Sequence, residues 1–177
     1  DPIILAELAL TLEQSGKSDH AMNIASEAQA KAQTDISIAI FYAKMCLSRG
    51  LASKAMQALE QAINSDPTNP EAWQLLSMAA NSSGTLPVPL KYAQKCIQLH
   101  PQEAQPHATL ATAHRLNGHL NNALASYEQA LEKNPSFPEA IAGKAEVLES
   151  LGRTKEAEAL LQHAPKTDSV LIALAKI

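Results

Sequence analysis

The chain has 177 residues, of which 46% are hydrophobic, and a net charge of −4 at neutral pH. The acidic balance and the lack of a lysine or arginine cluster argue against nucleic-acid binding, and no run of about 18 apolar residues could cross a membrane. The sequence opens without a methionine or a signal peptide. We therefore expect it to be an excised fragment or a processed chain.

Five glycines recur along the chain at intervals of 34 residues: Gly16, Gly50, Gly84, Gly118 and Gly152. A fixed period of this length indicates a repeat protein. Each glycine lies between two segments with apolar periodicity, where a residue that tolerates positive φ is suited to the corner. We predict an A helix before each glycine and an antiparallel B helix after it, and number positions from that glycine.

Further positions keep the same period. Small residues prevail at positions −7, +5 and +12, and proline stands at +17 in three copies: Pro67, Pro101 and Pro135. Small side chains let two helices approach closely, and proline ends the second helix. This pattern resembles the tetratricopeptide repeat, most closely between Pro106 and Pro135, and the resemblance covers roughly residues 2 to 164. It implies an all-α fold, a right-handed superhelical solenoid of antiparallel helix pairs.

In chain order, the period predicts one solenoid domain over residues 1–177, with repeats at 2–35, 36–69, 70–103, 104–137 and 138–166 and an additional or capping helix at 168–177. Asn69 and Pro70 should begin the third A helix, as an N-cap and a first-turn proline. Gln33 replaces the proline of later copies, so we expect the first B helix to extend. Pro87 and Pro89 should fall in the first turn of the third B helix.

The sequence contains no catalytic, nucleotide-binding or metal-binding motif, so we predict that this chain is not itself an enzyme and holds no cofactor. His107 and His114 share one helix face, but both stand at packing positions, and we interpret them as structural rather than as metal ligands. Cys46 and Cys96 should be buried thiols rather than a disulfide, because their spacing indicates no pair.

The A helices of such a stack should line a concave groove. Positions −10, −9, −6 and −3 should point into it. The candidate partner-binding residues at these positions are Ile40, Phe41, Lys44, Gln74, Met78, Asn81, Thr109, Thr112, Arg115, Glu146 and Glu149.

This predicted groove is apolar in the second and third repeats and acidic in the fifth. We therefore predict a protein–protein interaction scaffold that binds a protein or peptide segment of unknown identity, without nucleic-acid binding or membrane insertion. Lys44 and Arg115 suggest an acidic flank on that segment. The alternative is the non-catalytic repeat region of a larger enzyme, such as a bacterial sulfotransferase or glycosyltransferase.

Overall fold

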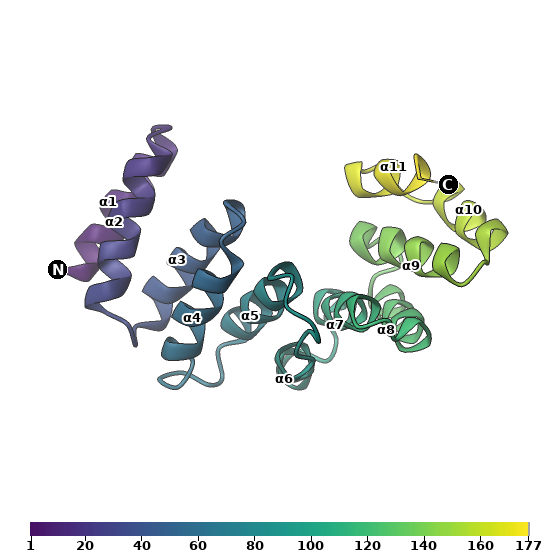
Figure 1. The fold of residues 1–177 in the computed structure, drawn as a ribbon, viewed down its shortest axis with the longest axis horizontal. Coiled ribbons are helices and arrows are strands. Elements are labelled where there is room, and N and C mark those ends of the chain that lie inside the picture. The colour runs from purple at the N-terminus through teal and green to yellow at the C-terminus, as the bar shows by residue number, and fades with distance from the viewer. Residues whose placement is uncertain (177) are drawn as a thin grey trace. The chain divides into compact units, whose positions relative to one another are not determined.

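The computed structural model describes residues 1–176 as an all-α protein (Figure 1). Eleven helices follow one another within that range: α1 (Pro2–Gln14), α2 (Ser18–Lys31), α3 (Ile36–Ser48), α4 (Ala52–Ala62), α5 (Pro70–Ser82), α6 (Lys91–Leu99), α7 (Ala104–Leu116), α8 (Leu120–Lys133), α9 (Pro138–Ser150), α10 (Thr154–Gln162) and α11 (Asp168–Leu174). The predicted all-α chain of sequential A and B helices is confirmed. The additional helix predicted at 168–177 is present as α11, and Ile177 lies outside the described residues.

The five repeat glycines mark the turns between A and B helices, and their φ angles lie between 70° and 77°. In the first turn, the Gly16 amide donates to the carbonyl of Glu13 at 3.0 Å. The following amide, of Lys17, donates to the carbonyl of Leu12 at 2.9 Å. These bonds satisfy carbonyls at the end of α1. They need a left-handed backbone conformation at Gly16, which only glycine adopts without strain.

The predicted start of the third A helix is also confirmed. The Asn69 side chain accepts a hydrogen bond from the amide of Ala72 at 3.1 Å, and Pro70 is the first residue of α5. Asp35 caps α3 in the same way, through the amides of Ser37 and Ile38. Because Asp35 starts a new helix there, α2 ends at Lys31, and the expected extension of the first B helix through Gln33 is wrong.

The helices divide into two compact units, unit 1 (Asp1–Gly84) and unit 2 (from Thr85 onwards). In unit 1, α3 packs against α1, α2, α4 and α5. The small residues predicted at helix contacts are fully buried here, including Ala9, Ala21, Ala43 and Ala55. Close approach of the helices therefore rests on alanine, as the repeat pattern indicates.

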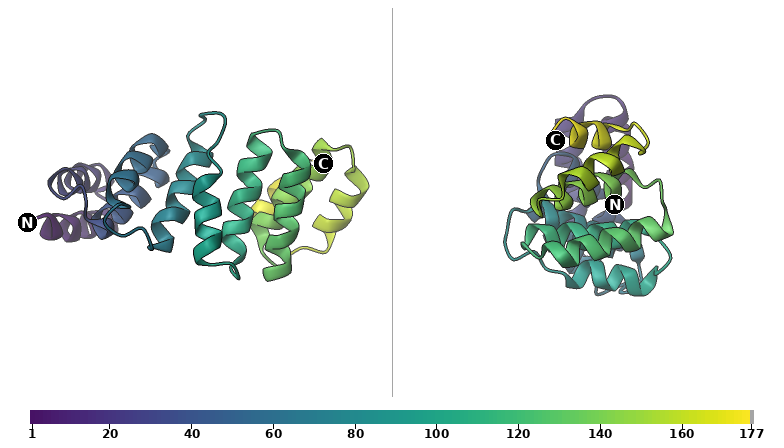
Figure 2. Two further views of the ribbon diagram at one scale, coloured as in Figure 1. Left: turned by 90° about the horizontal axis from the view of Figure 1, so that it is seen from below. Right: turned by 90° about the vertical axis from the view of Figure 1, so that its right-hand side faces the viewer.

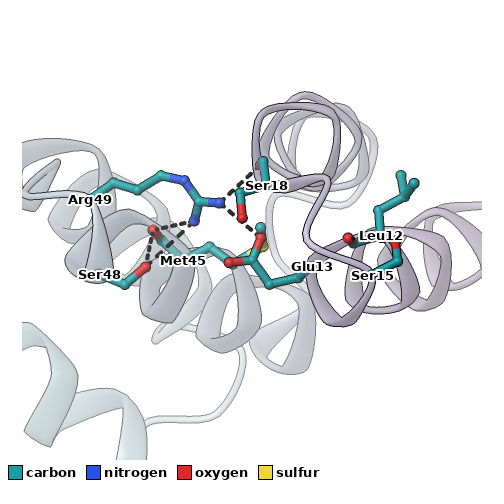
Figure 3. A network of polar contacts seen from close by, with 7 residues as sticks. All are labelled: Leu12, Glu13, Ser15, Ser18, Met45, Ser48 and Arg49. Carbon is teal, nitrogen blue, oxygen red and sulfur yellow. Dashed lines mark hydrogen bonds and ion pairs between the residues drawn. The ribbon is translucent and has the colours of Figure 1, made fainter.

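One arginine links the first two repeats of unit 1 (Figure 3). The Arg49 guanidinium pairs with the Glu13 carboxylate at 2.8 Å and donates to the carbonyl of Ser18 at 2.9 Å. It also donates to the carbonyl of Met45 in α3, at 3.1 Å. Arg49 thus joins the end of α3 to the corner between α1 and α2.

In unit 2, α7 and α8 lie side by side, and α9 packs on α7, α8, α10 and α11 (Figure 2). One core cluster surrounds Tyr127 and includes the fully buried Ala111, Ala123 and Ala130. In a second cluster, Val170 and Ala173 of α11 pack with residues of α9 and α10. The apolar face of α11 is therefore an integral part of this unit.

The third repeat departs from its prediction at the prolines. Helix α6 begins at Lys91, after both Pro87 and Pro89, so these prolines precede the helix rather than lie in its first turn. The segment is held instead by Asn117, whose side chain accepts from the amide of Val88 at 2.7 Å and donates to its carbonyl at 3.0 Å. The helix that follows, α6, is 9 residues long.

Candidate partner-binding surface

Position −6 is the most exposed of the four predicted groove positions. In unit 1, Leu10 is 47% exposed and Met78 is 39% exposed, and Lys44 is exposed as well. In unit 2, the same position holds Thr112 and Glu146, which are half-buried. The A helices of unit 1 thus present long side chains to solvent at one recurring position.

Position −13, which the sequence analysis overlooked, belongs to the same face. It precedes position −6 by seven residues, or two helix turns, so the two positions lie on one side of each A helix. Ile3 is 59% exposed there, and Glu71 is exposed. The Glu71 carboxylate lies 2.6 Å from the Lys44 ammonium, so this cation is already neutralised by a neighbouring helix. The seven-residue spacing of Glu71 and Met78 was the signal that could have found it.

At position −9 the predicted exposure of Thr109 is wrong, whereas the role of Phe41 stays a prediction. Thr109 is buried, and Phe41 is only partly exposed. At the same position, a Cβ on Gly143 would overlap the phenol ring of Tyr127. Tyr127 belongs to the preceding B helix, α8, so in the fifth repeat position −9 packs toward that helix instead of facing solvent.

The remaining candidates lie at intermediate depth. Ile40, at position −10, is 8% exposed, so its predicted place on the surface is also wrong. Gln74, at the same position, is half-buried, as are Asn81, Arg115 and Glu149 at position −3. Positions −6, −3 and −13 therefore provide the accessible A-helix surface, and position −10 contributes mainly to packing.

In unit 2, this surface contains a recess of about 330 Å³ between α7, α9 and the end of α11. Arg115 pairs with Glu146 at 3.4 Å, and Lys176 pairs with the same carboxylate at 2.7 Å. The rest of the lining is Ala145, Glu149, Ser150 and Ala173. Both cations of the recess are thus paired with one acid.

Glu149 is the remaining charged residue of this recess. It forms no ion pair within residues 1–176, and its Oε1 atom is shielded from solvent without a hydrogen-bond partner there. Two cations and two carboxylates line the recess, but both cations form ion pairs with Glu146. The electrostatics of the recess therefore favour an added positive charge beside Glu149.

Thr112 has a structural contact inside unit 2. Its hydroxyl lies 2.9 Å from the Tyr127 hydroxyl and donates to the carbonyl of Ala108 at 3.0 Å. Tyr127 is the side chain that occupies the space beside Gly143. Thr112 thus contacts a buried tyrosine, and its predicted role in partner binding stays a prediction.

The titratable groups provide no reactive centre in the described part of the chain. Burial raises the pKa of the Cys96 thiol to about 11, with a smaller contribution from Glu103, and burial also raises the pKa of Cys46. Both cysteines are buried and form no disulfide, as predicted. Burial, followed by the nearby His119, lowers the pKa of His114. Thiols that stay protonated are poor nucleophiles. The neutral imidazole of His114 is a structural group.

Neither a metal site nor a membrane span is found among the described residues. Between residues 1 and 176, no three histidine, cysteine, aspartate or glutamate side chains are grouped to hold a metal ion. The buried His107 ring lies 3.3 Å from the carbonyl of Pro101, a contact within its own loop and helix. None of the helices in this range is long and apolar enough to cross a membrane.

Comparison with known families finds one description for most of the sequence. The profile of the family described as tetratricopeptide repeat matches residues 12–79 and 114–176. A curated relative, Hsp70-Hsp90 organizing protein 2 of Arabidopsis thaliana, is 23% identical over 104 residues. That match takes in 59% of the present chain and only 18% of the relative, so the chain spans less than a fifth of the relative's length.

Solved structures show the same fold. TTC0263, a thermophilic TPR protein of Thermus thermophilus, matches with a TM-score of 0.74 and 23% identity, covering 99% of this chain and 98% of that one. YrrB, described as a TPR protein with an unusual peptide-binding site, matches with a TM-score of 0.71 and 16% identity, covering 99% and 92%. At these identities the likeness concerns the fold alone.

Proposed function

This chain belongs to the tetratricopeptide repeat family, and we propose that it binds a segment of a partner protein on the exposed A-helix positions −13, −6 and −3. The observation that carries the proposal is the exposure of Met78 and Leu10 at one repeat position, beside the charged pair of Lys44 and Glu71. Exposed apolar side chains with a polar surround are typical of interaction surfaces.

The chemistry of the partner segment follows from the two units taken separately. In unit 1, Lys44 is neutralised by Glu71, so the surface favours an apolar side chain against Met78 and Leu10 rather than an acidic one. In unit 2, Arg115 and Lys176 are occupied by Glu146, and Glu149 favours a lysine or arginine. The acidic flank predicted from Lys44 and Arg115 thereby loses its support.

The family and its members support a binding role. Tetratricopeptide repeat domains typically mediate protein–protein interactions, and YrrB is a member described as having a peptide-binding site. The described residues contain no evident catalytic domain, which agrees with a scaffold role for this chain. Long, flexible methionine side chains are favoured at adaptable binding surfaces, which fits Met78.

The proposal is tested with a displayed library of random peptides, selected on the immobilised protein. We expect one group of enriched peptides with a large apolar residue and another group with lysine or arginine. The apolar peptides are then titrated against Met78→Ala and the basic peptides against Glu149→Gln. Each substitution should weaken binding by about tenfold, equivalent to about 1.4 kcal/mol.

Two matched substitutions control this experiment. Leu86→Ala removes another exposed apolar side chain, in the loop before α6, and Glu158→Gln removes an exposed carboxylate on α10. Both should bind like the unaltered protein. If Met78→Ala and Glu149→Gln, shown to be folded, also bind like it, the A-helix surface is not the site.

A further inference from the structure

A second recess, of about 260 Å³, lies in unit 1 between the B helices α2 and α4, over Tyr42 of α3. None of its residues belongs to the A-helix positions assigned above to partner binding. Its lining consists of polar side chains and small alanines: Ser26, Gln29, Ala30, Gln33, Tyr42, Lys54, Gln57, Ala58 and Gln61. Four glutamines in one recess distinguish it from the rest of the repeat surface.

Two of these glutamines break the repeat pattern. Position +13 holds Gln29 in the first repeat, where the next three repeats have the aliphatic residues Ile63, Ile97 and Leu131. Position +17 holds Gln33, where those repeats have proline. The later repeats use these two positions for packing and for helix termination. Both polar replacements line the same recess, which indicates that they have a function there.

Gln29 is buried without full hydrogen bonding. It is 7% exposed, its Nε2 donates only a long bond of 3.5 Å to the Gln33 carbonyl, and its Oε1 has no partner among the described residues. A buried amide without partners destabilises a fold compared with the aliphatic side chain of the later repeats. A ligand that supplies a donor here would remove this penalty.

The polar side chains form two facing rows. Ser26, Gln29 and Gln33 follow at three- and four-residue spacing along α2 and just beyond it. Lys54, Gln57 and Gln61 do the same along α4. Residues at this spacing share one side of a helix. Each carboxamide can both donate and accept, which matches the alternating N–H and C=O groups of an extended peptide.

Charge narrows the ligand further. Lys54 is the one charged residue in this lining, it is exposed, and it forms no ion pair within residues 1–176. The buried Tyr42 phenol hydrogen-bonds Ser26, and burial raises the pKa of Tyr42, so the floor of the recess is neutral. A carboxylate is the complementary group for Lys54.

We propose that this recess is a second binding site, in which the two glutamine rows hold the backbone of an extended peptide and Lys54 pairs with its carboxylate. The site is independent of the A-helix surface. A partner could therefore occupy the A-helix surface while another segment, from the same or another protein, occupies the recess.

The test uses capped tripeptides as probes, Ac-Ala-Asp-Ala-NH₂ and Ac-Ala-Lys-Ala-NH₂, with methyl glucoside as a non-peptide probe. Binding is followed by NMR through the side-chain amide resonances of the glutamines in the intact chain. We expect saturable shifts with the aspartate peptide at about millimolar dissociation constants, and binding of the lysine peptide weaker by about tenfold. The glucoside should cause no saturable shift.

Variants assign the binding to the recess. Gln29→Leu restores the aliphatic residue of the later repeats, so it should keep or raise the melting temperature while abolishing the shifts. Gln57→Ala introduces the residue found at the same position in α8 and α10, Ala125 and Ala159, and should weaken binding without unfolding the chain. Gln129→Leu, on the exposed side of α8, and Met78→Ala should leave it unchanged.

Several results would overturn the proposal. These are the absence of saturable shifts with the aspartate peptide, equal binding of the lysine peptide or of the glucoside, or unaltered binding by folded Gln29→Leu and Gln57→Ala. Loss of tripeptide binding in Met78→Ala would place the peptide on the A-helix surface instead. Because Met78→Ala and Gln29→Leu are scored separately, failure of this site and failure of the A-helix surface are distinguishable.

Discussion

The two units join neighbouring repeats by different contacts. In unit 1, the junction between the first two repeats includes the charged side chain of Arg49, which reaches Glu13 and the carbonyl of Ser18 (Figure 3). In unit 2, the junction between the fourth and fifth repeats depends on Tyr127, which fills the space left by the missing side chain of Gly143. One contact is electrostatic and partly exposed, and the other is steric and buried.

This difference teaches which properties of a repeat stack are set by the period and which by individual residues. The glycines and small alanines recur in both units and place the helices. The two junction contacts described above use different residues, so these junctions should respond differently to salt, pH and substitution. Three predictions test this comparison, in decreasing order of expected effect.

Gly143→Leu should be the most destabilising change, because its side chain would overlap the Tyr127 ring. We expect a loss of about 3 kcal/mol in the free energy of unfolding, from overpacking of a fully packed junction. Hydrogen exchange should locate the loss in unit 2 and leave α1–α4 unaffected. Urea denaturation of the same variant measures the loss in the free energy of unfolding.

A double substitution checks the mechanism. Tyr127→Leu combined with Gly143→Leu recreates the pair of leucines found at the same two positions earlier in the chain, Leu59 and Leu75. The double variant should recover much of the stability that Gly143→Leu loses, which appears as a coupling energy in the mutant cycle. Purely additive effects would contradict a direct contact between the two side chains.

Arg49→Ala should cost less, about 1–2 kcal/mol, because the ion pair is partly exposed to solvent and only part of its Coulomb energy is retained. The loss should appear in α1–α3 and should shrink as salt is raised. Lys31→Ala, which removes an exposed ion pair with Glu27 inside α2, is the matched control and should have almost no effect. A loss that does not depend on salt would argue against the electrostatic character of the junction.

The smallest effect should be a dependence of unit 2 on acid. Burial lowers the pKa of His114 in the folded chain, so below about pH 6.5 the unfolded chain binds more protons at this residue. The stability that His114 contributes is present above that pH and is lost as the pH falls through the folded pKa. His114→Leu should flatten this dependence between about pH 7 and pH 5.

Thermal melts of the unaltered protein and of His114→Leu, between about pH 7 and pH 5, provide the measurement. His20→Gln, an exposed histidine of unit 1, should leave the dependence as it is. If His114→Leu melts with the same pH dependence as the unaltered chain, the imidazole is not a source of acid sensitivity.

Much of the fold follows from the sequence because the period repeats the same local physics five times. The glycine corners, the buried alanines and the Asn69 cap each depend on one residue and its immediate neighbours. The failures involve longer-range or competing constraints. At Gln33 an N-cap at Asp35 ended the run of the first B helix, and at Pro89 the bonds from Asn117 replaced the first helical turn.

The binding surface was less predictable, because exposure depends on the neighbouring repeat as well as on the helix itself. The burial of Thr109 and Ile40 could not be read from their own helices. The pairing of Lys44 with Glu71 depends on how α3 and α5 are aligned against each other. The residue pattern of a single helix does not contain this alignment. The binding role of the residues at positions −6 and −3 stays a prediction, and the predicted exposure of Thr109 and Ile40 is wrong.

The boundary of unit 1 has a practical consequence for dissecting this protein. The repeats suggest a cut before α5, at Asn69, but the compact unit ends after α5, at Gly84. Because α5 packs on both α3 and α4, a fragment ending at Asn69 would expose the apolar sides of those helices and should aggregate when expressed. A fragment ending at Gly84 keeps them covered, so protein engineers should follow the packing rather than the repeat.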